Sequence, residues 1–303
     1  MKVATIDIGT NTTRLAIVES SPFKVISKYR TITRLGEHFN GTLSKEAMER
    51  VIRTIESYTE IIKKNKVDKV RAVATSVVRE AKNSVQFISS IRQKTGINID
   101  IVDGETEASL TFKGVLSVLA PQTEDFILLD IGGGSNEFSL IKNRKLIKSV
   151  SLKFGVVFLY EKFIKNDPPL NEELSMLTDT IRDNIFKVSD MLKVHESNKL
   201  AFVGTAGTVT TLAAIKLCLN KYNPAKINNC KIDRNFLMEL LQDMVKMKNE
   251  ERGIKFRIEK GREDVILPGL LIVRECMELF KFKEIIAIDS SLLEGIAFDL
   301  LQE

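Results

Sequence analysis

One segment of the sequence combines glycine with carboxylate side chains in a pattern suited to phosphate and a divalent cation. In residues 128–137, LLDIGGGSNE, an apolar run typical of a buried strand leads into three glycines flanked by Asp130 and Glu137. Successive glycines let backbone N–H groups face inward and bind an anion. The two carboxylates would instead hold a hard cation such as Mg²⁺, which bridges to phosphate. The simpler alternative is a glycine-rich hairpin with exposed acids.

Two further loops offer groups that bind phosphate. Residues 7–14, DIGTNTTR, supply hydroxyls, an amide and the guanidinium of Arg14, which can bind two oxygens at once. Residues 204–208, GTAGT, join a predicted strand to a predicted helix, whose N-terminal N–H groups attract anions. Each loop alone also fits a polar hairpin or an ordinary strand-to-helix turn, so its pairing with the glycine segment is what favours a phosphate site.

Candidates for the reaction itself stand at two predicted strand-to-helix junctions. Arg79 lies in the first turn of a helix within ATSVVREAKN, and Glu105 and Glu107 are two residues apart in DGETEA. In a helical first turn the two carboxylates point in different directions, so only one is expected to face a cleft. For both junctions the alternative is a solvated arginine and acids placed favourably at a helix N-terminus.

The elements that must position these residues form an α/β pattern that occurs twice. Strands are expected at 3–8, 15–19, 25–33, 69–74, 98–102, 126–130, 137–142, 145–152, 199–203 and 284–288. Helices are expected at 44–64, 77–94, 105–119, 156–164, 172–194, 208–219, 234–247, 263–280 and 292–300. Both halves open with strand, Asp-Ile-Gly, turn and strand, which indicates an internal duplication. We therefore expect two lobes, 1–121 and 122–303, with mixed sheets, outer helices and a cleft between them.

Composition excludes several functional classes. The 303 residues carry a formal net charge of +5, which is too dilute for a dedicated nucleic-acid binder. Three separated cysteines and two histidines argue against a zinc site, a disulfide framework or a Ser-His-Asp triad. The apolar runs are too short for a membrane span or a signal peptide. The chain is expected to be cytoplasmic, without nucleic-acid or membrane partners.

Eight segments together resemble the exopolyphosphatase / guanosine pentaphosphate phosphohydrolase (Ppx/GppA) family. In order they are DIGTNTTRL, ATSVVREAKN, GETEASLTFKGV, LLDIGGGSNEFSL, SLKFGVVFLYEKF, GTAGTVTTLAAI, GREDVILPG and SLLEGIAFDL. The resemblance runs from Val3 to Leu300. It implies two ribonuclease H-like lobes, as in the acetate and sugar kinase, Hsp70 and actin superfamily, with the active site in the interlobe cleft.

The resemblance also implies residue roles. Glu107 would be the general base that activates water, and Arg79 would neutralise charge near the scissile phosphate. Asp130 and Glu137 would hold Mg²⁺ or Mn²⁺ and position water, with Asp7 as a further metal ligand. The residues expected to bind substrate are Thr10, Asn11, Arg14, Gly132, Gly133, Gly134, Ser135, Asn136, Gly204, Thr205, Gly207 and Arg262. Departures are Asn136, where the family commonly has Thr, and Thr10 and Thr12, where it commonly has Ser.

The expected activity is release of orthophosphate from the ends of inorganic polyphosphate. Long family members append a helical HD-like domain and a further C-terminal domain, which this sequence lacks, so shorter polyphosphate or a nucleotide becomes more plausible as substrate. The nearest alternative is guanosine pentaphosphate (pppGpp) 5′-phosphohydrolase, which the sequence does not separate. A sugar or acetate kinase and an actin-like nucleotide-binding scaffold are the remaining alternatives. The oligomeric state is left open, a homodimer included.

Overall fold

The chain forms two compact units, one of which is made of two separate segments of the sequence. The computed structural model describes residues 1–20, 22–194 and 200–302. One unit comprises Met1–Gly114 together with Ser291–Glu303, and the other comprises Val115–Ser290. The sequence-based boundaries, 1–121 and 122–303, differ from this division mainly because helix α12 (Leu292–Gln302) returns to the first unit. Its apolar residues Leu293, Ala297 and Leu300 are buried in one cluster with residues of the first two strands.

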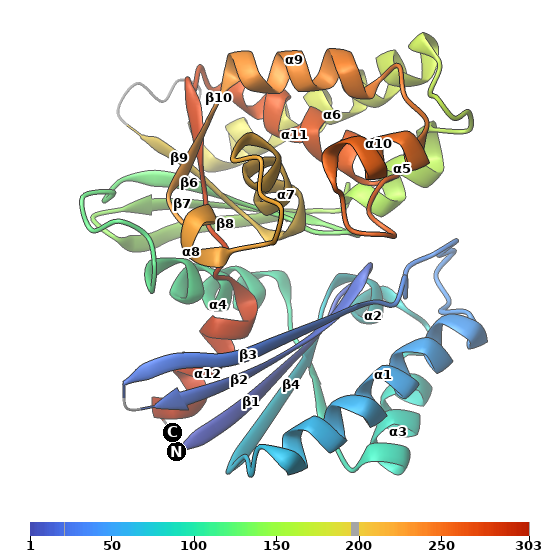
Figure 1. The fold of residues 1–303 in the computed structure, drawn as a ribbon, viewed down its shortest axis with the longest axis vertical. Coiled ribbons are helices and arrows are strands. Elements are labelled where there is room, and N and C mark those ends of the chain that lie inside the picture. The colour runs from blue at the N-terminus through green and yellow to red at the C-terminus, as the bar shows by residue number, and fades with distance from the viewer. Residues whose placement is uncertain (21, 195–199, 303) are drawn as a thin grey trace. The chain divides into compact units, whose positions relative to one another are not determined.

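The first unit is built on a five-stranded mixed sheet (Figure 1). Its strands are β1 (Lys2–Ile8), β2 (Thr12–Ser20), β3 (Phe23–Ile32), β4 (Lys69–Ala74) and β5 (Ile99–Ile101), in the order β3-β2-β1-β4-β5. The first three form an antiparallel meander, and β4 and β5 continue the sheet in parallel with β1. The central strand β1 is buried at nearly every position, whereas the edge strand β3 is largely exposed or half-buried. The burial of β1 explains why its continuous run of apolar, β-branched residues predicted a strand.

The helices of the first unit largely follow the predicted pattern, with one break. They are α1 (Lys45–Lys64), α2 (Ser76–Glu80), α3 (Ser84–Thr95), α4 (Gly104–Leu116) and α12. Helix α1 begins at Ser44, whose side chain accepts a hydrogen bond from the Ala47 amide, and it lies beside α3 (Figure 1). The single helix predicted at 77–94 was wrong. Extended backbone at Ala81 separates α2 from α3, and the Asn83 side chain bonds both backbone groups of Leu43 instead.

Helices α4 and α12 approach each other so closely that only glycine fits. A Cβ on Gly295 would lie 1.8 Å from the Leu110 carbonyl oxygen, and one on Gly114 would lie 1.9 Å from the Ser291 carbonyl oxygen. We expect Gly295→Ala to lower the free energy of unfolding by about 3 kcal/mol or more, because backbone cannot give way as a flexible side chain does. Urea denaturation would measure this, with Gln302→Ala at the exposed end of α12 as control. An unchanged midpoint for Gly295→Ala would contradict the packing described.

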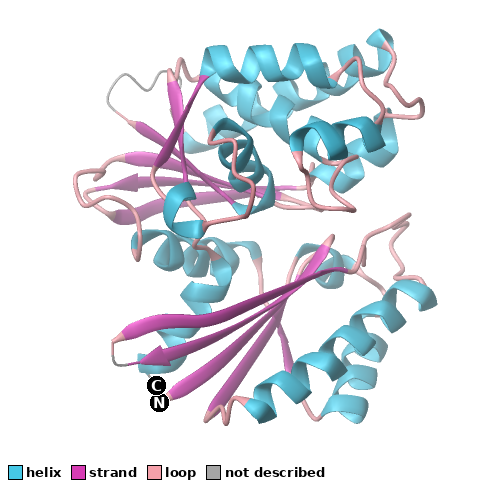
Figure 2. Cartoon of the chain, viewed as in Figure 1, coloured by secondary structure: helices cyan, strands magenta, loops and turns pink. Residues whose placement is uncertain are grey.

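The second unit repeats the sheet of the first with one added strand (Figure 2). Its strands are β6 (Phe126–Ile131), β7 (Asn136–Lys142), β8 (Lys145–Leu152), β9 (Ala201–Thr205), β10 (Cys230–Asp233) and β11 (Glu284–Ala287). The order is β10-β11-β9-β6-β7-β8, in which β8-β7-β6-β9-β11 corresponds to β3-β2-β1-β4-β5. The predicted α/β class, with two mixed sheets of ribonuclease H-like order, is confirmed. Residue 199, where a strand was predicted to start, lies outside the described residues.

Several short elements of the second unit were not predicted. Its helices are α5 (Val156–Phe163), α6 (Asn171–Leu192), α7 (Ala206–Lys216), α8 (Pro224–Ile227), α9 (Arg234–Met244), α10 (Asn249–Phe256) and α11 (Ile266–Leu279). Strand β10 and helices α8 and α10 were not predicted from the sequence. Helix α10 has no apolar periodicity because its buried anchor is Arg252, whose guanidinium bonds to the carbonyl oxygens of Met244 and Met247. Pro268 is tolerated because it occupies the first turn of α11, where no intrahelical N–H bond is lost.

Candidate active site

The loop between β6 and β7 has its carbonyl groups fixed by the start of α5. The amides of Gly155, Val156 and Val157 donate to the carbonyl oxygens of Gly134, Gly132 and Gly133, at 3.0, 3.0 and 2.9 Å. The N-terminus of α5 is therefore satisfied by this loop. Because the carbonyls of its three glycines all accept hydrogen bonds from residues 155–157, the loop is held in one shape rather than being a loose glycine-rich hairpin.

The same loop leaves backbone donors available. Within the described part of the chain, the amides of Gly133 and Gly134 donate no hydrogen bond, whereas the Gly132 amide donates to the Ser135 carbonyl oxygen at 3.0 Å. Adjacent N–H groups of this kind form an anion-binding concavity. The loop also needs Gly155 beneath it, because a Cβ there would lie 2.3 Å from the Gly133 carbonyl carbon. The glycine segment thus presents two adjacent unbonded N–H groups, and its role as a phosphate loop stays a prediction.

A row of four polar side chains crosses the second sheet next to this loop. In the strand register Asp130 lies opposite Glu137, Glu137 opposite Ser151, and Asp130 opposite Thr205. Directly opposed residues on neighbouring strands point to the same face of a sheet, so the two predicted metal ligands are neighbours. Glu137 is 3% exposed, and its Oε1 accepts hydrogen bonds from Ser135 Oγ at 2.6 Å and Ser151 Oγ at 2.7 Å.

Two predicted substrate-binding side chains of this segment have other partners in the structure. The Ser135 hydroxyl is engaged with Glu137, so it adds to the carboxylate rather than extending from the loop. Asn136 is fully buried, on the sheet face opposite to Glu137, and its Nδ2 donates to the Phe154 carbonyl oxygen at 2.7 Å. An amide buried there can stabilise the loop but does not present its side chain to a ligand. Gly133 and Gly134 remain the predicted substrate contacts that the geometry favours here, whereas the Gly132 amide is bonded to Ser135.

The third predicted loop brings Gly207 and Arg262 together. A Cβ on Gly207 would lie 2.0 Å from Nη1 of Arg262, so the guanidinium rests directly on the backbone at the start of α7. Thr205 is turned away, since its Oγ1 donates to the Ile288 and Ser290 carbonyl oxygens at 3.0 and 3.2 Å. Gly204 faces Ile285 and Val209 within the unit's core. Arg262 with the first turn of α7 is therefore the cationic part of this loop, and Gly204 and Thr205 shape it.

Arg262 is presented by a loop that sequence analysis did not resolve. Its Nε lies 3.2 Å from Oε2 of Glu259, and its side chain is 11% exposed. Gly261 supplies the left-handed turn before it, at φ +88°. The buried Arg252 supports the far end of the loop through the Glu263 carbonyl oxygen, at 3.3 Å from Nη1. Burial lowers the pKa of the Arg252 guanidinium. The burial of Arg252 could not be predicted from the sequence, because its neighbours in α10 are also charged.

In the first unit, Asp7 and Arg14 form an ion pair across β1 and β2, in which Asp7 is buried and Arg14 is partly exposed. Arg14 donates from Nε and Nη2 to the same oxygen, Asp7 Oδ2, at 2.8 and 2.5 Å, and its Nη1 lies 3.4 Å from Ser291 Oγ. The two residues are opposite each other in the strand register. Asp7 already engages Nε and Nη2 of Arg14, so the binding of two phosphate oxygens by Arg14 stays a prediction. Asp7 Oδ1 is buried without a hydrogen-bond partner.

The remaining residues of the first loop shape its backbone. The Thr10 carbonyl oxygen accepts from the Gly36 amide at 2.8 Å, and that of Asn11 accepts from the Thr33 and Arg34 amides at 3.0 and 2.9 Å. Thr10 is buried, whereas Asn11 is half-buried. The side chain of Asn11 is thus the better placed of the two to meet a ligand.

The two carboxylates at the start of α4, Glu105 and Glu107, differ in their exposure to solvent. Glu105 is exposed, whereas Glu107 is 8% exposed and its Oε2 lies 3.2 Å from Nη1 of Arg79. Arg79 also donates to the Val102 carbonyl oxygen at 2.7 Å. Asp103 accepts the Thr106 amide at 2.8 Å, and this backbone hydrogen bond is the main reason that the pKa of Asp103 is lowered. Of the two acids, Glu107 is the one with a fixed orientation, and Arg79 provides it.

The residues present fit a divalent cation on the second sheet better than on the first. In the described residues no three His, Cys, Asp or Glu side chains gather closely enough to hold a metal by themselves. Mg²⁺ commonly takes only one or two carboxylates and completes its shell with water and phosphate oxygens. Asp130 and Glu137 are two carboxylates that lie opposite each other on neighbouring strands, whereas Asp7 is ion-paired with Arg14. We therefore expect Asp130 and Glu137 to be the metal ligands.

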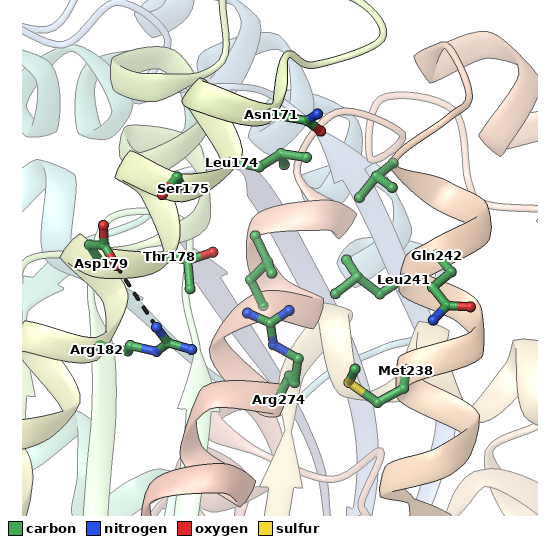
Figure 3. Close-up of a pocket in the computed structure, with 12 residues that line it drawn as sticks. Asn171, Leu174, Ser175, Thr178, Asp179, Arg182, Met238, Leu241, Gln242 and Arg274 are labelled. Atoms are coloured by element: carbon green, nitrogen blue, oxygen red, sulfur yellow. Dashed lines mark ion pairs between the residues drawn. The ribbon is translucent and has the colours of Figure 1, made fainter.

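A hollow elsewhere on the second unit involves none of these residues (Figure 3). It has a volume of about 390 Å³ and is lined by α6, α9 and α11. Its arginines, Arg182 and Arg274, donate to opposite oxygens of the buried Glu275, at 2.5 and 2.6 Å between Nε and oxygen. The hydrogen bond that Arg182 donates to the Glu275 carboxylate raises the pKa of Arg182. These arginines are structural ion pairs rather than part of the predicted site.

Comparison with known proteins assigns the chain to a family. The model of the Ppx/GppA phosphatase family matches residues 14–303. The chain belongs to the Ppx/GppA phosphatase family. It is similar, at 28% identity over 99% of this chain and 98% of the relative, to exopolyphosphatase 2 of Mycobacterium tuberculosis. A crystal structure of the Aquifex aeolicus family member matches 100% of this chain and 98% of that one, with a TM-score of 0.83 and 30% identity.

A further relative shares only part of its length with this Ppx/GppA phosphatase. The bifunctional 3-dehydroquinate synthase/phosphatase of Fusobacterium nucleatum is 33% identical over 96% of this chain, which spans 45% of that protein. The resemblance read from eight sequence segments is thus confirmed at the level of the family, and the chain is a hydrolase of that family. No helix among residues 1–20, 22–194 and 200–302 is both long and apolar enough to cross a membrane.

Proposed function

We propose that this Ppx/GppA phosphatase is an exopolyphosphatase that releases orthophosphate from the ends of inorganic polyphosphate. The observation that carries the proposal is the glycine loop of the second unit, in which Gly133 and Gly134 keep their N–H groups unbonded next to the opposed carboxylates Asp130 and Glu137. Backbone donors suit the terminal phosphate of any chain because they recognise charge and shape without reading a base or sugar. Since Asp130 and Glu137 lie beside this phosphate site, we propose that a metal ion assists the hydrolysis.

The predicted residues that the geometry favours each have a task in that reaction. Mg²⁺ or Mn²⁺, held by Asp130 and Glu137, would neutralise charge on the phosphoanhydride. Gly133 and Gly134 bind the terminal phosphate through their backbone N–H groups, Gly132 holds the loop in shape, and Arg262 adds a cation for the following phosphates. Glu107, oriented by Arg79, accepts a proton from the attacking water. A loose, anionic transition state requires little more than an aligned water and neutralised charge.

The alternative within the same chemistry is hydrolysis of pppGpp. The family includes guanosine pentaphosphate phosphohydrolases, and the same loop would bind the 5′-triphosphate end of that nucleotide. This activity would additionally need groups that recognise guanine, and none of the contacts described above selects a base. Polyphosphate is therefore the substrate that the described site favours.

A comparison of substrates with a single preparation tests the proposal. We expect phosphate release from short and long polyphosphate with Mg²⁺ present, loss of that release with excess chelator, and recovery on adding Mg²⁺ or Mn²⁺. Turnover of pppGpp at a higher kcat/KM than either polyphosphate would replace the proposal with the alternative. Full activity in the presence of excess chelator would show that the reaction needs no metal ion and would contradict that part of the proposal.

A further inference from the structure

We infer that Ser151 is a positioning residue for Glu137, one that fixes this carboxylate for cation binding. The inference rests on the proposed function only in that Asp130 and Glu137 are taken as the metal ligands. Ser151 Oγ donates to Glu137 Oε1 at 2.7 Å, and Ser135 Oγ donates to the same oxygen at 2.6 Å. Two donors on one oxygen fix the rotation of the carboxylate, which a single hydrogen bond would leave freer.

The two serines differ in how they reach Glu137. Ser135 belongs to the glycine loop and is only two residues away along the chain. Ser151 lies on the neighbouring strand β8, so its contact depends on the register between β7 and β8. Glu137 is almost completely buried beside Asp130, where a carboxylate without donors would be costly. The hydroxyl of Ser151 therefore links the position of the carboxylate to the sheet rather than to the loop.

A β-bulge sets this register. The pairing of β7 with β8 shifts by one residue between Leu140 and Ile141. Continuing the pairing from the hairpin end without that shift would place Val150, instead of Ser151, opposite Glu137. An irregularity in the strand thus exchanges an apolar neighbour for a hydroxyl donor at the predicted metal ligand. Bulges often redirect a side chain next to an active site.

The first unit provides an internal comparison. Its corresponding row carries Asp7, Arg14 and Arg30 on β1, β2 and β3, where the second unit has Asp130, Glu137 and Ser151. In the first row an arginine neutralises the aspartate directly. In the second row the equivalent position is a second carboxylate, and the third strand supplies a neutral donor to it. The hydroxyl on the third strand therefore occurs only in the unit that has two opposed carboxylates, although both units share the same sheet order.

Direct metal binding by the full chain, measured without substrate, tests the inference. We expect Ser151→Ala to weaken Mn²⁺ affinity by about 10- to 100-fold in electron paramagnetic resonance titrations, and Ser151→Thr, which keeps the hydroxyl, to recover most of it. The Mg²⁺ concentration that gives half-maximal phosphate release should rise in parallel. Ser149→Ala is the matched control, because Ser149 lies on the same strand but opposite Ser139.

The outcomes separate this inference from the proposed function. Equal Mn²⁺ affinities for the wild type, Ser151→Ala and Ser149→Ala would overturn it, as would a wild-type protein that binds no Mn²⁺. A loss of affinity confined to Ser151→Ala, at an unchanged midpoint of thermal unfolding, supports it. That result would stand even if the wild type hydrolysed pppGpp in preference to polyphosphate, because the titration contains neither substrate.

Discussion

Replacing Glu107 by glutamine is expected to reduce kcat for phosphate release by about 10²- to 10⁴-fold, the usual contribution of a general base. The amide keeps an oxygen that can accept the Arg79 hydrogen bond, seen at 3.2 Å in the wild type, but it cannot take a proton from water. The fold should therefore survive while turnover is lost. A steady-state assay of orthophosphate release, with circular dichroism to confirm folding, provides the measurement.

Glu105 offers a matched control for this substitution. It lies on the same turn of α4, carries the same charge and is exposed, whereas Glu107 is buried. Glu105→Gln should leave kcat within about twofold of the wild type, because its carboxylate is oriented by no partner comparable to Arg79. If both variants kept wild-type turnover, the proton would have to go elsewhere. If only Glu105→Gln lost turnover, the roles of the two acids would be reversed.

Gly155→Ala is expected to have the second large effect, on substrate binding. The added methyl group would lie 2.3 Å from the Gly133 carbonyl carbon and 2.3 Å from the Gly134 nitrogen, so the loop backbone must move. Movement of the loop displaces the N–H groups proposed to bind phosphate. We expect KM for polyphosphate to rise at least about tenfold, since one such hydrogen bond to a charged group contributes about 1.5–3 kcal/mol.

Val156→Ala distinguishes loop displacement from simple loss of stability. Val156 is the next residue and is 5% exposed in the core of the second unit. Its truncation creates space without pressing on the loop, so it should lower the urea midpoint while leaving KM almost unchanged. A rise in KM for Val156→Ala as large as that for Gly155→Ala would show that stability, and not loop position, governs substrate affinity.

The predictions that succeeded from sequence depended on local patterns. Buried strands followed by glycine or by a helix start were visible as β-branched runs and turn residues, and the duplicated Asp-Ile-Gly motif revealed the repeated sheet. Helix α1 was equally legible, because its apolar residues recur at helical spacing behind a serine cap. These features are determined within about ten residues of chain, the range that patterns of hydrophobicity and capping can report.

What the sequence could not show depended on partners distant in the chain. Arg14 was expected to bind phosphate, yet strand register places it against Asp7. Asn136 was expected to bind substrate, yet its side chain holds the Phe154 carbonyl group in the interior. Ser151 and Gly155 were missed although both lie in a segment that carried the family resemblance. Their importance depends on which residues they face across β7 and across the glycine loop.

The return of α12 to the first unit has a consequence for the order of folding during synthesis. Residues 115–290 form one uninterrupted compact unit, whereas the other unit needs both ends of the chain. Leu293 and Ala297 are synthesised after residues 115–290, yet they complete the cluster that covers Val3 and Val18. We expect the inserted unit to fold first, while one apolar side of the first sheet stays uncovered until α12 has been synthesised. Nascent chains stalled before residue 290 should therefore depend on chaperones more than the released protein does.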